Sequence, residues 1–248
     1  MKLTIVGCAG SFPGPDSPAS CYLIEADGFR LVMDLGSGAL GPLQRYCGLD
    51  EVDAVCLSHL HGDHCLDMCG YSVARRYHPD GPRPRLPVYA PAGAAERLAA
   101  ALGESTGITD AFQFRTLAPG PVQIGPLRIT AARMNHPVET FGFRLEHDGA
   151  ALAYSADTGP CAELGELARA ADVLLCEASF LDQPGLPRDL HLTARQAGEA
   201  AGRAGARRLL LTHLVAWNDP AASRAEAAAA FGGELAVARA GQHLVLGG

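Results

Sequence analysis

Four side chains that commonly bind divalent metals lie within six residues, in the run His59-Leu-His-Gly-Asp-His64. The run directly follows an apolar, strand-like segment. Imidazole and carboxylate groups are typical ligands of zinc, manganese and iron. In an extended segment residues two apart share a face, so His59 and His61 can bind one ion. Asp63 and His64 are adjacent and diverge, so the run predicts metal binding at two sites rather than a metal-free, hydrogen-bonded turn.

Further ligands are needed, because zinc takes roughly four, and three candidates end other apolar runs of the chain. These are His136, Asp157 and His213. Strand ends that meet at one edge of a sheet are the usual place for a site in open α/β folds. Taken singly, each residue is equally compatible with a turn or a helix cap. Together with the six-residue run they indicate one shared site.

From its N-terminal strand to about His213 the chain resembles the metallo-β-lactamase superfamily. The resemblance implies that His59, His61 and His136 bind one ion, that Asp63, His64 and His213 bind another, and that Asp157 bridges them. The cofactor implied is a pair of zinc ions, with manganese as the alternative. A hydroxide shared by the ions is the expected nucleophile, because a dinuclear site lowers the pKa of bound water. The fold implied is an α/β, four-layer αββα sandwich, with residues 1–248 as a single domain.

Two further motifs resemble the ribonuclease Z-like phosphodiesterases: Cys176-Glu-Ala-Ser-Phe180 and His191-Leu-Thr193. By this resemblance His191 faces the scissile phosphate, where it stabilises charge or protonates the leaving oxygen, and Glu177 orients and charges the imidazole. Asp63 is counted with them as a catalytic residue. The alternatives are a helix-capping role for His191 and a solvated loop carboxylate for Glu177. These motifs favour phosphodiester cleavage.

Other positions have supporting or surface roles in this interpretation. Asp34 is expected to orient the loop that carries the ligands, because ligating histidines need hydrogen-bond acceptors behind them. The glycine-rich segment 7–14 is either a phosphate-binding loop or a tight turn. Three other histidines, at positions 78, 147 and 243, have no such context and are expected on the surface.

The chain departs from ribonuclease Z in a way that changes the expected substrate. The tRNA-binding arm of those enzymes falls between the ligands that correspond to His136 and Asp157, where this chain has a short hairpin that turns at Asp148-Gly149. The net charge of −7 also disfavours nucleic acid, whose binding depends on basic patches. The pair Arg75-Arg76 is interpreted as a solvated helix end. Small phosphodiesters such as cyclic nucleotides are therefore the expected substrates.

Alternative functions remain open at this stage. Asp63 stands where zinc β-lactamases have a cysteine, which argues against that activity. Lactone or thioester hydrolysis uses the same ligands but leaves His191 and Glu177 without a role, and tRNA 3′-end cleavage is the remaining nuclease alternative. A metal-binding sensor without catalysis is the other class, since Trp217-Asn-Asp-Pro220 replaces the serine and arginine that follow the last histidine in ribonuclease Z. The resemblance also implies a homodimer.

The elements that position these residues alternate between strands and helices, as in an α/β fold. With 248 residues, 48% of them hydrophobic, the chain can bury a substantial core. The strands expected are Lys2 to Val6, Cys21 to Glu25, Arg30 to Asp34, Ala54 to Leu57, Val173 to Cys176 and Leu209 to Thr212, and the helices are Ala92 to Leu102, Cys161 to Ala170, Ala194 to Ala204 and Pro220 to Phe231.

The location expected from the sequence is the cytoplasm. The first residues form a strand-like segment rather than a signal peptide. No apolar run approaches the roughly 20 residues that span a membrane. The eight cysteines are scattered and are expected to be reduced.

Overall fold

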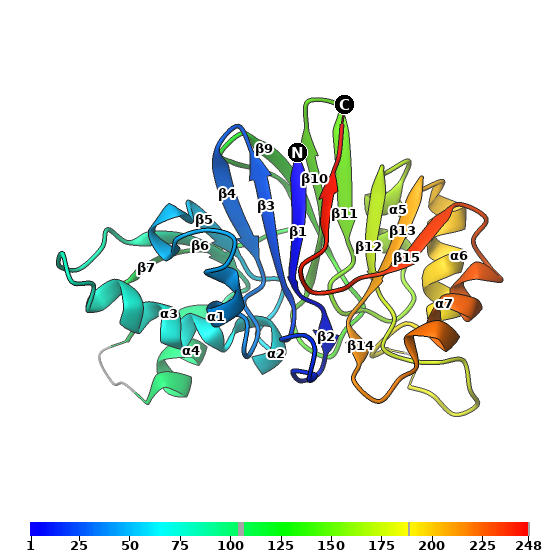
Figure 1. The fold of residues 1–248 in the computed structure, drawn as a ribbon, viewed down its shortest axis with the longest axis horizontal. Helices are drawn as coiled ribbons and strands as arrows, with labels where there is room; N and C mark the ends of the chain where they lie inside the picture. Colours follow the sequence, from blue (N-terminus) through cyan, green and yellow to red (C-terminus); the bar gives the residue numbers. More distant parts are fainter. Residues whose placement is uncertain (104–106, 188, 248) are drawn as a thin grey trace.

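The computed structural model of the protein describes residues 1–103, 107–187 and 189–247. Within these residues two seven-stranded sheets pack face to face, and helices cover the outer side of each sheet (Figure 1). The four-layer αββα sandwich predicted from the sequence is therefore confirmed. Among the same residues, no helix is both long and apolar enough to cross a membrane.

The first sheet has the strand order β16-β1-β3-β4-β5-β6-β7. Its strands are β1 (Lys2–Gly7), β3 (Cys21–Ala26), β4 (Phe29–Met33), β5 (Ala54–Cys56), β6 (Leu86–Ala90), β7 (Phe112–Thr116) and β16 (His243–Val245). The helices on this side of the sandwich are α1 (Leu40–Leu43), α2 (Gly62–Cys65), α3 (Asp67–Arg76) and α4 (Ala94–Leu102), with a 3₁₀ turn at Leu49–Glu51.

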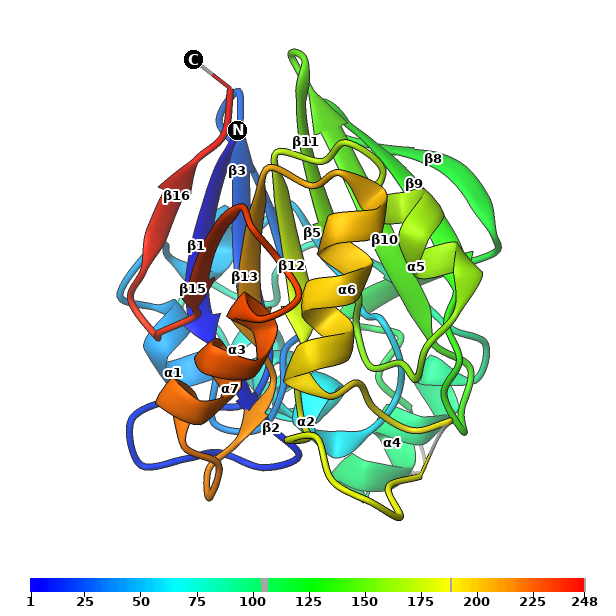
Figure 2. The same ribbon diagram turned by 90° about the vertical axis from the view of Figure 1, so that its right-hand side faces the viewer.

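The second sheet has the order β15-β13-β12-β11-β10-β9-β8. Its strands are β8 (Gly120–Ile124), β9 (Leu127–Arg133), β10 (Phe141–His147), β11 (Ala150–Tyr154), β12 (Val173–Glu177), β13 (Arg208–Thr212) and β15 (Glu234–Val237). Helices α5 (Ala162–Ala168), α6 (Ala194–Ala204) and α7 (Pro220–Ala228) lie over its outer face, as Figure 2 shows.

A third, two-stranded sheet joins segments from the two ends of the chain. Strand β2 (Ala9–Gly10) pairs in parallel with β14 (Leu214–Val215). This small sheet lies at the lower edge of the sandwich in Figure 1, close to α2. It holds the loop after β1 beside the loop after β13.

Strand β12 shows why the central strands are apolar throughout. All five of its residues are buried. Val173 and Leu175 belong to the core between the two sheets, whereas Leu174 and Cys176 belong to the core under α5 and α6. Because side chains alternate between the faces of a strand, a strand covered on both faces needs an uninterrupted apolar run.

The predicted elements agree with the observed ones to within a few residues. Helix α6 has the predicted bounds, because Thr193 and Gln196 form a capping box at its start and Gly205 ends it in the left-handed conformation, with φ +66°. The helix predicted from residue 92 begins at 94, after a left-handed Gly93, and α7 ends three residues earlier than predicted. The apolar run before His136 was expected to be a strand and is β9. Strands β2, β6 to β8 and β14 to β16 and helices α1 and α2 were not among the predictions.

Two surface predictions were wrong. Arg75 is buried, and Arg76 bonds Asp110 through two nitrogens at 2.8 Å, so this pair is not a solvated helix end. The side chain of His147 is only 8% exposed and bonds Asp27 at 2.9 Å. In each case elements distant in sequence cover the side chain. The residues next to it in sequence give no sign of this burial.

Candidate metal centre and active site

All seven predicted ligand side chains meet at the edge of the sandwich where α2 lies. The run from His59 to His64 leads from the end of β5 into α2. The other three residues each follow a strand of the second sheet: His136 follows β9, Asp157 follows β11 and His213 follows β13. Strand ends of both sheets therefore supply the site, as predicted from the sequence.

The side chains form two groups that share Asp157. One group is His59, His61, His136 and Asp157; the other is Asp63, His64, Asp157 and His213. In each group the candidate ligand atoms all lie within 4.8 Å of one another. One oxygen of Asp157 faces each group: Oδ2 lies 3.6 Å from His59 Nε2, and Oδ1 lies 3.2 Å from His64 Nε2.

The spacing of the ring nitrogens fits a shared cation. His61 Nδ1 lies 3.1 Å from His59 Nε2 and 3.2 Å from His136 Nε2. In the other group, His64 Nε2 and His213 Nε2 are 3.2 Å apart. Two nitrogens on one tetrahedral zinc ion, each about 2.0–2.1 Å from it, lie roughly 3.3 Å from each other. The residues present therefore fit a divalent metal.

Asp34 fixes the direction of two of these rings. The hydroxyl of Ser58 donates its hydrogen to Asp34 Oδ2 at 2.8 Å, so it accepts from His59 Nδ1 at 3.0 Å. His64 Nδ1 donates directly to the same oxygen at 2.8 Å. With the Nδ1 hydrogens turned outward, the Nε2 lone pairs point into the centre.

Asp34 is itself held firmly. Its Oδ1 accepts the backbone N–H of Ser58 at 2.7 Å, and its Oδ2 also accepts the hydroxyl of Tyr154 at 2.8 Å. Its backbone is left-handed, with φ +55°, and its side chain is fully buried. The supporting role predicted for Asp34 agrees with this position.

The rings of His136 and His213 have their own acceptors. His136 Nδ1 donates to the carbonyl of Leu190 at 2.9 Å. His213 Nδ1 lies 2.8 Å from the hydroxyl of Ser179, which in turn donates to Glu177 Oε2 at 2.9 Å. Each ring thus presents Nε2 to the centre, as the other anchored rings do.

The electrostatics of the first group suit a cation. Burial lowers the pKa of His59, and it does the same for His61 and His136. These three imidazoles are therefore neutral, and each keeps a free lone pair. A cation can bind there without displacing a proton.

The second group carries the negative charge. Burial alone would raise the pKa of Asp157, but His213 and His64 lower it well below its ordinary range, and hydrogen bonds from the same histidines lower the pKa of Asp63. Burial also opposes a charge on His64, yet the carboxylates of Asp157 and Asp34 outweigh it and raise the pKa of His64. Asp157 Oδ1 accepts no hydrogen bond among the described residues although it is buried. A metal ion at this group would balance the negative charge of Asp157 and Asp63.

Glu177 and His191 form a pair beside this centre. His191 Nδ1 donates to Glu177 Oε1 at 2.9 Å. Glu177 ends β12 and is fully buried, so the alternative of a solvated loop carboxylate was wrong. Its remaining hydrogen bonds come from Thr158 N at 2.7 Å and from Ser179 N and Oγ at 3.3 and 2.9 Å. Burial lowers the pKa of His191, but Glu177 outweighs burial and raises it to about 9.

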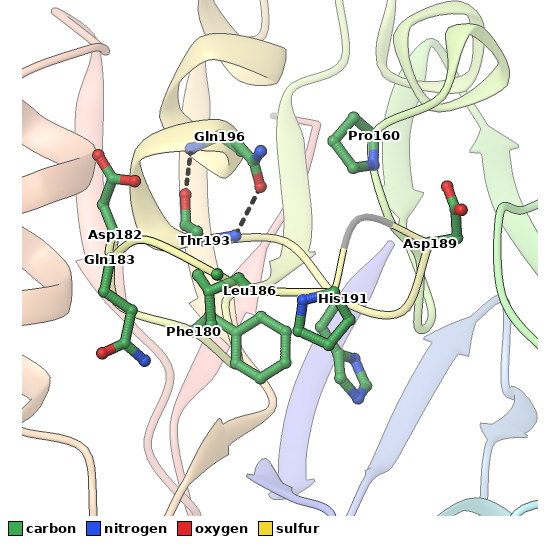
Figure 3. A pocket seen from close by; sticks show the side chains of 11 residues that line it. Pro160, Phe180, Asp182, Gln183, Leu186, Asp189, His191, Thr193 and Gln196 are labelled. Carbon is green, nitrogen blue, oxygen red and sulfur yellow. Dashed lines mark hydrogen bonds between the residues drawn. The ribbon is translucent and has the colours of Figure 1, made fainter.

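A cavity of about 560 Å³ opens on His191 (Figure 3). One wall contains Phe180, whose ring packs edge-on against His191 with 5.4 Å between centroids. Asp182 and Asp189 lie around the opening, and Leu186 adds an apolar side chain. The imidazole therefore has the metal centre on one side and space for part of a substrate on the other.

The glycine-rich segment serves close packing in this structure. A Cβ at Gly10 would lie 2.3 Å from the carbonyl oxygen of His213. Outside the segment, in the turn after Asp34, a Cβ at Gly36 would lie 1.9 Å from the carbonyl oxygen of Asp63. Any side chain at these positions would displace a ligand-bearing loop. The tight-turn interpretation of the segment is the one that this geometry supports.

The sequence interpretation missed the hydroxyls of Ser58 and Ser179, which bond the rings of His59 and His213. It also missed the hydroxyl of Tyr154, which bonds Asp34, and the backbone N–H of Thr158, which bonds Glu177. Ser58 and Ser179 do adjoin the motifs directly, so their position next to His59 and two residues after Glu177 was an available signal. Tyr154 lies 120 residues from Asp34 and gives no such signal.

Comparison with known proteins gives related sequences over almost the whole chain. A family model described as "Beta-lactamase superfamily domain" matches residues 30–214. The uncharacterized protein ML1173 of Mycobacterium leprae is 47% identical over 242 residues, which cover 95% of this chain and 85% of that protein. Ribonuclease Z of Mycobacterium bovis is 32% identical over 271 residues, covering 96% of this chain and 95% of the relative.

A solved structure agrees closely with this one. The "Probable metallo-hydrolase YhfI" of Bacillus subtilis is 31% identical over 252 residues, covering 97% of this chain and 98% of that protein. The crystal structure of YhfI superposes with a TM-score of 0.88 and covers 98% of both chains.

Proposed function

The chain belongs to the beta-lactamase superfamily as a metallo-hydrolase, and from that premise we propose that it cleaves small phosphodiesters, cyclic nucleotides among them. The observation that carries this proposal is the pair of Glu177 and His191, whose Oε1 and Nδ1 are 2.9 Å apart, with His191 lining a cavity beside the candidate metal centre. A lactone or thioester hydrolase needs the metal ligands but has no use for this pair.

Two divalent ions, zinc or manganese, are the proposed cofactor. His59, His61 and His136 would hold one ion, Asp63, His64 and His213 the other, and Asp157 would contact both. When bound, such ions supply a nucleophile from water at neutral pH and offset negative charge on the phosphoryl oxygens. The shared position of Asp157, with one oxygen toward each group, supports this assignment.

His191 is the proposed proton donor to the leaving oxygen. Its Nδ1 hydrogen is committed to Glu177, so the protonated ring has its Nε2 hydrogen free for a substrate. The raised pKa, about 9, keeps the ring protonated at neutral pH. Proton transfer by such a positioned side chain contributes typically 10²–10⁴-fold to a rate.

Glu177 and Asp63 have distinct proposed roles. Glu177 is a positioning residue: hydrogen bonds from Thr158 and Ser179 hold its carboxylate in place, and it fixes the imidazole of His191 in one orientation. Asp63 belongs to the second candidate ligand group, and its carboxylate is the proposed acceptor for the proton of the attacking water.

Small substrates are proposed over tRNA although ribonuclease Z is among the relatives. The β10–β11 connection is a two-residue turn at Asp148-Gly149, with no room for an arm. Arg75 and Arg76 are engaged inside the fold, and two carboxylates line the cavity beside His191. These features give a polyanion little attraction.

The test is hydrolysis of bis(p-nitrophenyl) phosphate by protein loaded separately with zinc and with manganese. The Asp157→Ala variant is the control for contaminating activity, since it removes the group shared by both ligand sets. We expect turnover that this variant abolishes. No turnover with either metal bound would favour lactone hydrolysis or a non-catalytic sensor, and efficient cleavage of a tRNA precursor would contradict the proposed substrate size.

A further inference from the structure

Two aromatic side chains on neighbouring loops pack against each other while remaining open to solvent. The rings of Phe12 and Trp217 are 5.2 Å apart between centroids and are tilted by 44°. Trp217 is 76% exposed and Phe12 is 38% exposed. Exposed apolar groups that gather in one place, unlike single ones, mark sites of interaction.

The pair lies at the rim of the metal centre. Phe12 follows β2 and Trp217 follows β14, so the pairing of these two short strands brings the rings together. Ser11, the residue before Phe12, has its backbone nitrogen 3.4 Å from His213 Nε2. The aromatic pair is therefore one residue away from contact with a proposed ligand.

Hydrogen bonds fix the Trp217 loop relative to the centre. The side-chain amide of Asn218 donates to the carbonyl of Ser179 at 2.8 Å, and Asn218 N donates to Val215 O at the same distance. The hydroxyl of Ser179 in turn bonds His213 Nδ1. A change in the position of this loop would disturb the ring of a ligand, so the exposed indole has a defined place beside the site.

We propose that Phe12 and Trp217 form a platform that stacks the aromatic base of the phosphodiester while its phosphate lies at the metal centre. The inference rests on the proposed function and names the substrate class more closely, as nucleotide esters. A π-face is a feature that every base shares, and stacking requires no basic patch, which agrees with the net charge of −7. The platform is on the side of His213, whereas the cavity beside His191 receives the leaving group.

The chain contains its own probe, because Trp217 is the only tryptophan in the sequence. Metal-loaded protein is titrated with adenosine 5′-monophosphate and, separately, with ribose 5-phosphate, and the fluorescence excited at the red edge of indole absorption is followed. We expect saturable quenching by the nucleotide at a roughly 5- to 150-fold lower concentration than any response to the sugar phosphate. Phe12→Ala should weaken the nucleotide response.

Equal responses to both probes, or none to the nucleotide, would overturn the platform. Tryptophan emission that changes with protein concentration but not with nucleotide would also overturn the proposal. Phe12 and Trp217 would then form a contact between copies of the chain. The binding readout separates the two proposals: nucleotide-specific quenching without hydrolysis of any diester keeps the platform and removes the phosphodiesterase.

Kinetics provide the second measurement. The p-nitrophenyl ester of thymidine 5′-phosphate and ethyl p-nitrophenyl phosphate share a leaving group, but only the first carries a base. Trp217→Ala should lower kcat/KM about 5-fold or more further for the first ester than for the second, and Trp217→Phe should restore most of that difference. Tyr77→Ala is the matched control, because Tyr77 is also 76% exposed but lies at the end of α3. Equal losses for both esters would contradict base stacking.

Discussion

The metal centre and its aromatic rim are built by different means. In the centre, His59, His64, His136 and His213 each have the ring nitrogen that faces away from the centre bonded to an oxygen. At the rim, Phe12 and Trp217 contact each other and solvent. Buried hydrogen bonds fix the geometry of a reaction, whereas exposed apolar groups select what approaches it. Changes in the centre should therefore affect every substrate, and changes at the rim only some.

The largest effect on turnover with metal retained is expected at His191, the proposed proton donor beside the centre. His191→Ala should lower kcat about 10²–10⁴-fold. The loss should be greater for a cyclic nucleotide, whose alkoxide leaving group needs a proton, than for bis(p-nitrophenyl) phosphate, whose nitrophenolate does not. The measurement is kcat for both substrates, with bound metal counted by atomic absorption.

The control for this variant is His78→Ala, which removes a histidine that pairs with Asp50 away from the site. It should leave both rates unchanged. Equal losses for the two leaving groups would limit His191 to charge stabilisation, and unchanged turnover would remove it from the mechanism.

Replacement of Glu177 tests whether the carboxylate acts through His191. Both oxygens of Glu177 accept hydrogen bonds, whereas a glutamine side chain has only one acceptor oxygen. Glu177→Gln should therefore lower kcat about 10- to 100-fold, the usual loss when the residue that orients a functional imidazole is replaced. Activity that needs the protonated imidazole of His191 is present at pH values below the pKa of His191 and is lost as the pH rises through that pKa. Without the carboxylate that raises the pKa of His191 to about 9, the alkaline fall in kcat should move to lower pH.

A pH–rate profile of the variant and the native protein checks this prediction, with thermal melting to show that both are folded. A lowered kcat with an unmoved alkaline limb would mean that Glu177 only stabilises the fold around Ser179 and Thr158.

Asp34 should control metal affinity rather than the chemical step. Asn tolerates the left-handed backbone at this position, so Asp34→Asn preserves the turn but sets an amide against the donors of Ser58, His64 and Tyr154. We expect metal affinity to fall about 10- to 100-fold and unfolding to become easier by about 2 kcal/mol. Equilibrium dialysis with zinc measures the first, and denaturant melts measure the second.

Asp53→Asn is the comparison for Asp34, because the exposed Asp53, just before β5, accepts one backbone hydrogen bond from Arg30. It should change neither quantity appreciably. At saturating metal the Asp34 variant should recover most of its kcat, and failure to recover would place Asp34 in the reaction itself.

The residues of the metal centre could be predicted from the sequence, whereas those of the aromatic rim could not. The run from His59 to His64 is local, and the ends of β9, β11 and β13 must meet at one edge, so strand pattern and residue type together located all seven side chains. The alternation of strand-like and helical runs likewise predicted an α/β fold and the bounds of α6, whereas the sandwich itself was implied by the family resemblance.

The rest depends on contacts that local sequence does not encode. Tyr154 reaches Asp34 across 120 residues, and Phe12 meets Trp217 only because β2 pairs with β14. The burial of Arg75 and of the His147 ring has the same origin, since each is covered by elements distant in sequence. Candidate metal ligands can be recognised by residue type and spacing. Serines, tyrosines and other aromatic residues that orient rings or lie beside the site cannot be recognised until the fold brings them together.

The smallest expected effect is electrostatic and lies at the opening of the cavity. Asp189 accepts a hydrogen bond from Asn135 at 3.0 Å, so Asp189→Asn keeps the shape and removes one exposed negative charge. Exposed charges a few ångströms apart interact weakly and are screened by salt. For a diester whose aryl leaving group carries a carboxylate, kcat/KM should therefore rise only about 2- to 5-fold, and only at low ionic strength. A diester with a neutral aryl leaving group should show no change in kcat/KM.

Asp148→Asn is the control, since that exposed residue lies in the β10–β11 turn, separated from Asp157 by the length of β11. An equal gain for both leaving groups, or one that persists in high salt, would mean that Asp189 acts by shaping the cavity rather than by repelling anions.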